Sequence, residues 1–382
     1  IMAAVYWGKQ DAASIEKVIP IALRTNLLFS GLFTILAGFC PEMLMRIFTN
    51  DAALVASGSQ YLRAVALSYV LCGISQVYLI LLKNTGHAAV SSRISSTAVV
   101  LNIILNAILI YGLCGAPALG IRGAAYATVA ARVVELIWAY LETKKPERVR
   151  ILWNRLFSSA GKILSEDFWR YTLPVLAASL VWGIAYVLYS VIMGHMGSDA
   201  VAANSITSIA KSLLSCLIRG VSGGAGVLIG NLLGANELEK AREYGRRLSH
   251  LSIAIGIVTG GLLMLISPAI VHFAPLSDTA AEYLQYMLLF CGLNLMAQSV
   301  NTTVLDGIFC AGGDAKFDMQ GNIGAMWCFS VPLGFLAAFW LKLPVMVVYC
   351  IVNLDEIVKL PAVYHHYKKY IWVRNITRDV ED

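Results

Sequence analysis

Lys83-Asn84-Thr85-Gly86 closes one long apolar run, and Cys310-Ala311-Gly312-Gly313 closes another 227 positions later. Further pairs recur at a spacing of 226 or 227: Pro41 with Pro268, Asp51 with Asp278, and Gly8-Lys9-Gln10-Asp11 with Gly234-Ala235-Asn236-Glu237. A single repeat that extends over two apolar halves is typical of transport proteins with two similar lobes. The repeat therefore predicts two related helical bundles with a path between them.

The composition places these bundles in a membrane. Apolar residues make up 58% of the chain and charged residues 14%, whereas soluble domains carry about 25% charged residues. A helix needs about 20 apolar residues to cross a bilayer, and about ten stretches of that length occur. They lie near residues 19–39, 62–82, 92–112, 121–141, 172–194, 204–230, 249–273, 283–308, 319–341 and 344–364. The sequence thus predicts an all-α integral membrane protein.

The repeat also predicts the domain organisation. We expect four parts: an N-terminal lobe over 1–142, a cytoplasmic linker over 143–170, a C-terminal lobe over 171–364 and a cytoplasmic tail over 365–382. The counterparts of the spans near 172–194 and 204–230 would fall at or before residue 1. We therefore expect a twelve-span plan of which the first span and most of the second are not in this chain. Six spans per lobe give both lobes one orientation, related by a pseudo-two-fold axis along the membrane normal.

The distribution of lysine and arginine predicts the orientation. Most of these residues fall in the connections on one side of the predicted spans, and the other side holds only Arg46, Arg63, Arg122 and Lys342. Cytoplasmic loops carry such an excess, so we expect a cytoplasmic C-terminus. We also expect a multi-pass protein of the plasma (inner) membrane that works as a monomer. The net charge of +6 is then a signal of orientation. A nucleic-acid partner would need a basic soluble face or a base-stacking module, and the sequence has neither.

The predicted linker allows two interpretations. Its end contains the pairs Ile163-Leu164 and Phe168-Trp169, which favour a helix lying on the inner membrane surface. The alternative is a solvated connection.

The sequence carries no pattern for catalysis or for a resident metal. None of the eight cysteines stands in CxxC spacing, and metal sites need clustered ligands. Motifs of metalloproteases, serine hydrolases, nucleotide-binding loops and magnesium-dependent prenyl transferases are absent. We therefore expect no enzymatic activity, and no cofactor besides a sodium ion or proton that couples to transport.

The span near 204–230 carries a polar stripe at the helical period. Its members are Asn204, Ser208, Lys211, Ser215, Arg219 and Ser222. Charged groups inside a membrane cost about 2.5–3.5 kcal/mol each on insertion scales, so this face is predicted to meet protein or water. Lys211 and Arg219 either line a substrate cavity or pair with carbonyls and carboxylates for structure.

The preceding span offers an aromatic face made of Trp182, Tyr186, Tyr189 and Met193. Aromatic rings attract a lipophilic cation, and methionine adapts to varied ligands. This face is a candidate cavity wall, and packing against lipid or the other lobe is the alternative.

The span near 283–308 combines amides with one carboxylate. Gln298 and Asn301 follow Asn294 at helical spacing, and Asp306 stands eight residues after Gln298. An intramembrane carboxylate is a functional candidate by default, so Asp306 is the first candidate for ion coupling; the alternative is a carboxylate at a cytoplasmic helix end. In the first lobe the same stretch has Ser75 and Gln76 as further cavity candidates, without a charge.

The last span contains Asp355, Glu356 and Lys359. Asp355 and Lys359 are four residues apart and can pair on one helix face. A structural ion pair near the inner surface is one interpretation. A role of Asp355 and Glu356 in ion coupling is the other.

Several stretches resemble the multidrug and toxic compound extrusion (MATE) family. They are Val5-Tyr6-Trp7-Gly8-Lys9-Gln10-Asp11 with its repeat Gly230-Asn231-Leu232-Leu233-Gly234-Ala235-Asn236, Asp306-Gly307-Ile308-Phe309-Cys310-Ala311-Gly312-Gly313-Asp314, Val331-Pro332-Leu333 and Trp372-Val373-Arg374-Asn375-Ile376-Thr377. The resemblance covers the whole chain. It implies an antiporter in which inward flow of sodium ions or protons drives organic cations out, while the lobes alternate between inward-open and outward-open states.

The chain departs from the family pattern in two places. Cys310 stands where a basic residue is usual, and residues 172–194 lack the carboxylate that some members carry there. The residues that couple the ion therefore stay open, with Asp306 placed before Asp355 and Glu356. The alternative functions are a lipid-linked substrate flippase of the same superfamily, which Lys211 and Arg219 favour, an intramembrane enzyme, and an inactive fragment.

Overall fold

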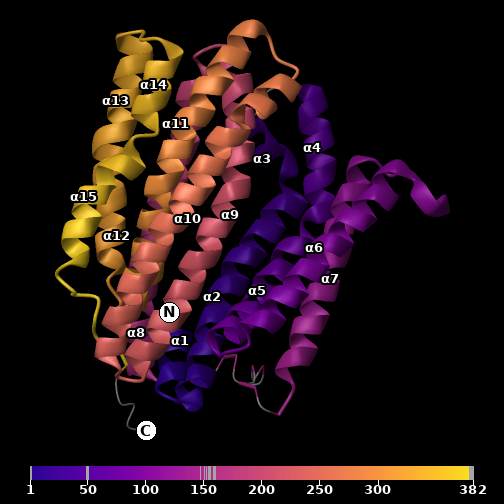
Figure 1. The fold of residues 1–382 in the computed structure, drawn as a ribbon. Coiled ribbons are helices and arrows are strands. Elements are labelled where there is room, and N and C mark those ends of the chain that lie inside the picture. The colour runs from indigo at the N-terminus through magenta and orange to yellow at the C-terminus, as the bar shows by residue number, and fades with distance from the viewer. Residues whose placement is uncertain are drawn as a thin grey trace. The chain divides into compact units, whose positions relative to one another are not determined.

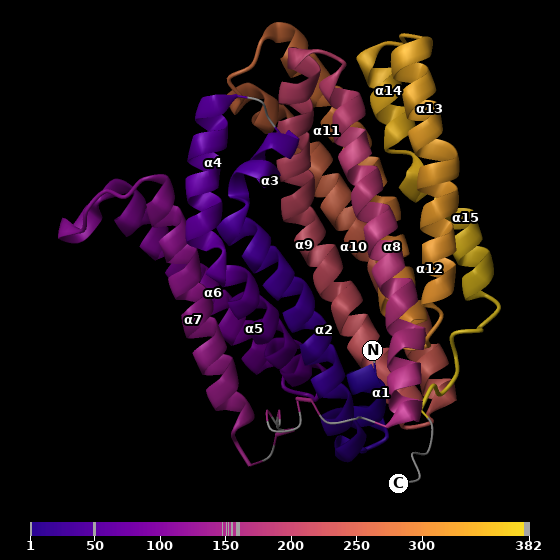
Figure 2. The same cartoon turned by 180° about the vertical axis from the view of Figure 1, so that it is seen from behind.

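The computed structural model describes residues 2–48, 51–146, 148, 149, 151, 153, 156, 157 and 161–377. All regular elements in these ranges are helical (Figures 1 and 2). The chain divides into two compact units, which we describe separately. The N-terminal unit holds the described residues of 11–168, and the C-terminal unit holds those of 2–10 and 169–377.

The described part of the N-terminal unit contains a short 3-10 turn at Leu113–Gly115 and six complete α-helices. They are α2 (Ala12–Phe39), α3 (Pro41–Phe48), α4 (Ala52–Val65), α5 (Leu67–Asn84), α6 (Ala88–Tyr111) and α7 (Ile121–Thr143). Its core contains Tyr78, Leu82, Ile94 and Ala139 from α5, α6 and α7. Asp51 caps α4 by accepting the N–H groups of Ala53 and Leu54, so the repeated aspartate marks a helix start.

The C-terminal unit contains the longest helices. Its elements are α1 (Met2–Gly8), α8 (Lys162–Gly194, which begins before the unit boundary), α9 (Ser198–Gly234), α10 (Leu238–Phe273), α11 (Asp278–Thr302), α12 (Ala315–Asn322), α13 (Val331–Phe335), α14 (Val345–Val352) and α15 (Asp355–Tyr367). Wider π-helical turns over Thr303–Phe309, Ile323–Ser330 and Leu336–Trp340 extend α11, α12 and α13. The core includes Leu263, Leu284, Leu288 and Leu295.

Within the described ranges, nine helices are long and apolar enough to cross a membrane. They account for nine of the ten expected spans, and the prediction of an all-α membrane fold is confirmed. The tenth stretch, 344–364, differs because α14 ends at Val352 and α15 begins at Asp355. Residues 162–170, at the end of the expected linker, form the first turns of α8. Residues 147, 150, 152, 154, 155 and 158–160 of the expected linker and 378–382 of the expected tail lie outside the described residues.

Helix α1 crosses the end of α9 with the backbones nearly touching. A Cβ atom on Gly8 would lie 1.9 Å from the Asn231 carbonyl oxygen, and one on Gly234 would lie 1.8 Å from the Val5 carbonyl oxygen. Gly8 corresponds to Gly234 in the repeat, and Val5 corresponds to Asn231 at the same spacing of 226. The two contacts are therefore reciprocal, as in an isologous interface, so this crossing has local two-fold symmetry.

Residues 372–374 pack against the C-terminal unit. Trp372 is buried and stacks on Tyr367, with ring centroids 5.9 Å apart. Arg374 donates to the carbonyl oxygens of Gly312 and Gly313, each at 2.9 Å. The Arg374 contacts hold this segment against the glycine-rich loop at Gly312 and Gly313, which follows the π-helical extension of α11.

Candidate functional site

The break between α14 and α15 is the starting point of the site. Asn353 and Leu354 interrupt the helix, and backbone carbonyls left unsatisfied inside a membrane are costly. Amide side chains of α11 supply the donors: Asn294 Nδ2 lies 2.6 Å from the Asn353 carbonyl oxygen. Asn301 Nδ2 lies 2.7 Å from the Glu356 carbonyl oxygen. The sequence pairs a broken helix with two amides that stabilise it.

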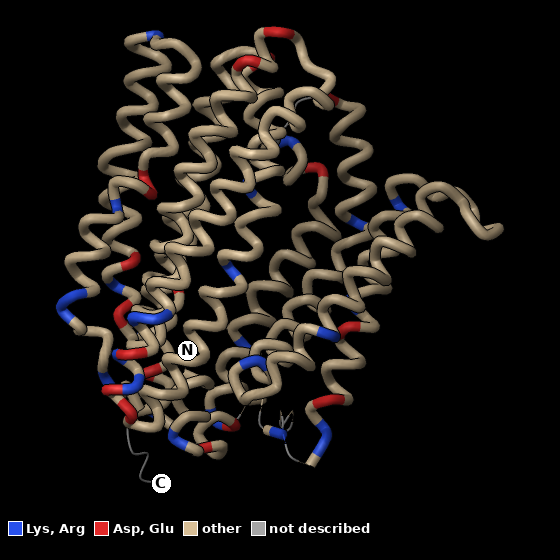
Figure 3. The backbone as a smooth tube through the Cα atoms, in the orientation of Figure 1, with Lys and Arg blue, Asp and Glu red and all other residues tan. Residues whose placement is uncertain are grey.

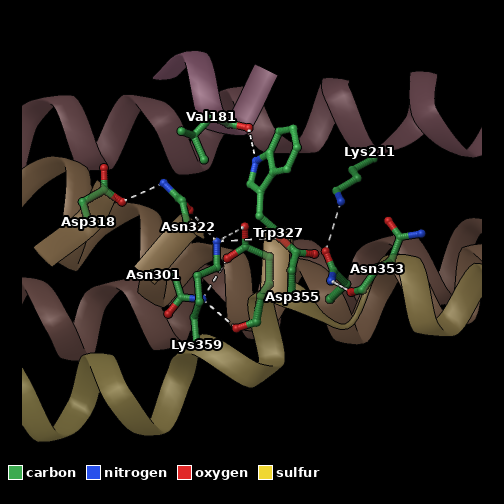
Figure 4. A network of polar contacts seen from close by, with 11 residues as sticks. Val181, Lys211, Asn301, Asp318, Asn322, Trp327, Asn353, Asp355 and Lys359 are labelled. Atoms are coloured by element: carbon green, nitrogen blue, oxygen red, sulfur yellow. Dashed lines mark hydrogen bonds and ion pairs between the residues drawn. The ribbon is translucent and has the colours of Figure 1, made fainter. Parts of the chain in front are cut away.

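An ionic cluster begins one residue after the break (Figure 4). Lys359 Nζ lies 3.1 Å from Glu356 Oε1 and 3.7 Å from Asp355 Oδ2. All three side chains are buried, with exposed fractions of 5–7%. Glu356 Oε2 also accepts from Asn301 Nδ2 at 2.8 Å. One ammonium group thus faces two carboxyl groups, so the cluster is one positive charge short when both are ionised.

The cluster extends to α12 through hydrogen bonds. Lys359 Nζ donates to Asn322 Oδ1 at 3.1 Å, and Asn322 Nδ2 donates to Asp318 Oδ1 at 3.1 Å. The indole of Trp327 donates to the Val181 carbonyl oxygen at 3.1 Å and joins this region to α8 (Figure 4).

Asn294 connects the cluster to α9. Its Oδ1 accepts from Lys211 Nζ at 3.1 Å while its Nδ2 bonds to the Asn353 carbonyl oxygen. Each end of the amide therefore has a partner, and Lys211 is held near the helix break.

A cavity of about 350 Å³, here called the main cavity, opens beside the cluster. Its polar lining residues are Ser179, Arg219, Gln298, Asn301, Thr302, Asp306, Asp318, Asn322, Glu356 and Lys359. The side chain of Asp306 is exposed. The buried oxygens Gln298 Oε1 and Asn301 Oδ1 have no hydrogen-bond partner in the described part of the chain. Such oxygens and carboxylates are the groups that coordinate a hard cation or hold a proton.

A second cavity of about 220 Å³, here called the aromatic cavity, shares Trp182, Arg219, Gln298 and Glu356 with the first. Tyr186, Tyr189, Lys211, Ser215 and Asp355 also line it. The rings of Trp182 and Tyr186 stack with centroids 5.4 Å apart, and the guanidinium carbon of Arg219 lies 5.7 Å from the centroid of Trp182. A small pocket of about 30 Å³ follows, lined by Asn204, Ser208 and Lys211.

The local helix geometry sets the position of Asp306. It lies in the π-helical turns Thr303–Phe309, and such turns recur at functional sites. Gly307 lets this segment approach α9, because a Cβ there would lie 2.8 Å from the Ser222 carbonyl oxygen. The Ser222 hydroxyl donates to the Thr302 carbonyl oxygen at 2.8 Å, which satisfies one acceptor of the irregular turn.

The structure brings most of the predicted site residues to these connected cavities. They are Trp182, Tyr186, Tyr189, Asn204, Lys211, Arg219, Gln298, Asn301, Asp306, Asp355 and Glu356. Ser75 and Gln76 lie instead on α5 of the N-terminal unit. The Ser75 hydroxyl donates to Glu135 Oε1 at 3.0 Å, and Glu135 also pairs with Arg132.

Sequence reasoning missed two residues that line the main cavity, Asp318 and Asn322, and one buried carboxylate of the N-terminal unit, Glu135. Asp318 and Asn322 stand four residues apart near the start of a span, a spacing that places two polar groups on one helix face and could have identified them. Glu135 is buried with Arg132 three residues before it. A lone carboxylate inside the span near 121–141 was its signal.

Comparison with known proteins gives one family model and several bacterial transporters that are similar to this chain. The MatE family model matches residues 1–108 and 174–336. The uncharacterized transporter YisQ of Bacillus subtilis (strain 168) is 20% identical over 98% of this chain and 82% of its own length. The probable multidrug resistance protein YoeA of the same organism is 21% identical over 100% of this chain and 82% of its own length. The probable multidrug resistance protein NorM of Thermotoga maritima is 24% identical over 84% and 70%.

Solved structures share the fold at low identity. A MOP superfamily transporter from Pyrococcus furiosus, described as having a binding pocket of reverse polarity, superposes with a TM-score of 0.86 at 19% identity, over 97% of this chain and 81% of its own. A MATE protein in complex with MaL6 gives a TM-score of 0.84 at 20% identity, over 97% and 82%.

Proposed function

Because this chain belongs to the MatE family of multidrug efflux transporters, we propose that it is a secondary active exporter that exchanges an inward-moving sodium ion or proton for an outward-moving organic cation. The observation that carries the proposal is the main cavity, where the exposed carboxyl group of Asp306 stands beside a buried cluster that is one positive charge short. A small cation or a proton can supply that charge.

Asp306 is the group that exchanges with the cavity. Its side chain is exposed, whereas Asp355 and Glu356 are buried and already share Lys359. An incoming ion can therefore reach Asp306 first, and Asp355 and Glu356 adjust through the lysine. A carboxylate that binds either the ion or the substrate cation makes the two mutually exclusive, which is the requirement for exchange.

The aromatic cavity is the site for the substrate cation. Stacked rings offer a lipophilic cation both apolar contact and attraction to the ring faces. The cavity joins the main cavity through four shared residues, so a substrate there lies near the coupling carboxylates. We propose that the chain works as a monomer, catalyses no reaction and has its tail in the cytoplasm.

The test is transport by purified protein in vesicles. Asp306→Asn keeps the size of the side chain and removes its charge. Loss of one charge-assisted contact corresponds to about a tenfold effect or more, so uptake of a fluorescent lipophilic cation should fall by at least that factor and lose its dependence on sodium and pH. Asp278→Asn is the matched control, because Asp278 is an exposed aspartate in the first turn of α11.

Two results would count against the proposal. Unchanged dependence on sodium and pH in Asp306→Asn would remove Asp306 from the coupling role. Scrambling of lipid-linked substrates without ion-driven uptake would instead support the flippase alternative.

A further inference from the structure

We propose that the cavity between the start of α8, the glycine-rich loop after α11 and the tail binds the phosphate group of an anionic membrane phospholipid. This cavity, here called the basic pocket, has a volume of about 220 Å³. It is lined by Arg170, Tyr171, Gly313, Asp314, Lys316 and Arg374, among others. It shares no residue with the main or aromatic cavity. Binding of a phospholipid there does not require the proposed transport mechanism.

The basic pocket concentrates positive charge from three separate segments. Arg170 comes from α8, Lys316 from α12 and Arg374 from the tail. Its one carboxylate, Asp314, is engaged elsewhere, because Asp314 Oδ2 lies 2.6 Å from His366 Nε2. Among the described residues no carboxylate lies within ion-pair distance of Arg170 or Lys316. The pocket is therefore ready for an anion that the described part of the chain does not provide.

The guanidinium of Arg374 is already oriented. Its Nε and Nη2 atoms donate to the carbonyl oxygens of Gly312 and Gly313, which fixes the plane of the group and leaves further N–H donors. A planar guanidinium recognises phosphate through such paired donors. Preorganisation of this kind lowers the entropy lost when an anion binds.

The loop geometry adds backbone donors. Gly313 adopts a left-handed conformation with φ of 71°, and a Cβ atom there would lie 2.8 Å from Tyr171 Cε1. Only glycine lets the ring of Tyr171 pack this closely on the loop. The following residues, Ala315 and Lys316, open α12, and the first N–H groups of a helix lack intrahelical acceptors and attract anions.

The position along α8 selects a lipid as the source of the phosphate. Arg170 directly follows Trp169, a residue type enriched at the level of the headgroups, and the side chain of Trp169 is 41% exposed. One turn later come the exposed apolar side chains of Leu173, Leu176 and Leu180 at helical spacing. A phosphate in the basic pocket would thus place acyl chains along this apolar surface. Basic pockets of this kind between transmembrane helices bind anionic headgroups.

Lipid retention measured by native mass spectrometry tests the inference on the full chain in detergent. Phosphatidylglycerol should bind at least tenfold more tightly than zwitterionic phosphatidylcholine. Arg170→Gln and Lys316→Gln should each weaken phosphatidylglycerol binding about tenfold, because each removes a charge-assisted contact. Both residues are exposed, so the fold should tolerate the changes. Lys369→Gln is the matched control, since Lys369 is an exposed lysine near the same chain end that does not line the pocket.

Two different results would contradict the two parts of the proposal, the lipid as the source of the phosphate and the basic pocket as the site. Binding of inorganic phosphate with no preference for phosphatidylglycerol over phosphatidylcholine would overturn the lipid source. Equal lipid retention by the native chain and by Arg170→Gln combined with Lys316→Gln would overturn the site itself. Neither measurement depends on transport. The lipid-binding result could therefore still be interpreted if the proposed exchange mechanism were wrong.

Discussion

The ammonium group of Lys359 lies at the centre of the buried ionic cluster of the C-terminal unit. It contacts two buried carboxyl groups and the amide oxygen of Asn322. Buried charges are costly without partners, and removing one partner leaves the other uncompensated. Lys359 therefore carries more of the stability of this cluster than either carboxylate, because it is the one cation within ion-pair distance of both among the described side chains.

Lys359→Met tests this assignment. The variant keeps most of the length of the side chain and leaves Asp355 and Glu356 without their cation, so we expect a loss of about 3–5 kcal/mol in the free energy of unfolding. Denaturant-induced unfolding of the purified protein in detergent measures it. Lys240→Met is the control, because Lys240 pairs with Glu237 at the surface with side chains 62% and 41% exposed, and such pairs contribute about 0–1 kcal/mol. Equal losses in the two variants would show that water, not Lys359, stabilises the carboxylates.

The candidate site was only partly predictable at the level of single residues. The helical spacing of Lys211 and Arg219, and of the amides before Asp306, predicted faces that meet protein or water, and these side chains line the cavities. Spacing along one helix carries no information about its neighbours. It could not show that Asn294 bridges Lys211 and the Asn353 carbonyl, because that bridge joins three segments far apart in the chain.

At the scale of elements, the structure differs from the sequence-based prediction at the interruption between α14 and α15. Residues 344–364 have the apolar content of a single span, so the hydropathy pattern predicts one helix. The break is stable because Asn294 and Asn301 satisfy backbone carbonyls beside it, and these amides belong to another helix. The local signal was the polar run of Asn353, Asp355 and Glu356 inside an apolar segment. Discontinuous helices of this kind form ion and substrate sites in transporters.

The crossing of α1 and α9 allows a prediction about helix packing. Gly234→Ala would place a Cβ 1.8 Å from the Val5 carbonyl oxygen, and because backbone must move, we expect destabilisation of about 1–3 kcal/mol. Gly224→Ala, on the same helix, meets nothing within 4 Å and should be neutral or stabilise by up to about 1 kcal/mol through helix propensity. Thermal unfolding of the two variants in one detergent makes the comparison. A midpoint for Gly234→Ala at or above that of Gly224→Ala would contradict the close crossing.

At the scale of the molecule, the repeat was the most informative part of the sequence. It relates positions through a constant spacing, and the reciprocal contacts of Gly8 and Gly234 occur where that spacing requires them. Composition was sufficient for the all-α membrane fold, because few apolar stretches of this length can be buried in any other way. Neither the repeat nor the composition could predict the irregular turns beside the main cavity, because π-helical geometry follows from packing rather than from periodicity.

The charge of the whole cavity system predicts which substrates are exported. Asp306, Asp318 and Glu356 line the main cavity together with Arg219 and Lys359, so three carboxyl groups outnumber two cations and the lining favours cations when the carboxyl groups are ionised. Arg219→Gln removes one positive charge from both cavities without touching the coupling carboxylates. We expect it to raise the ratio of cation to neutral-isostere transport about tenfold, because a unit charge a few ångströms away is worth about 1–4 kcal/mol at the dielectric of a hydrated cavity.

Initial rates for a quaternary ammonium substrate and its uncharged carbon isostere in vesicles give this ratio. Arg247→Gln, an exposed arginine of α10 that pairs with Glu243, is the control. A ratio that stays the same in Arg219→Gln would mean that the guanidinium is only a packing partner of Trp182 and that substrate charge is selected elsewhere in the chain.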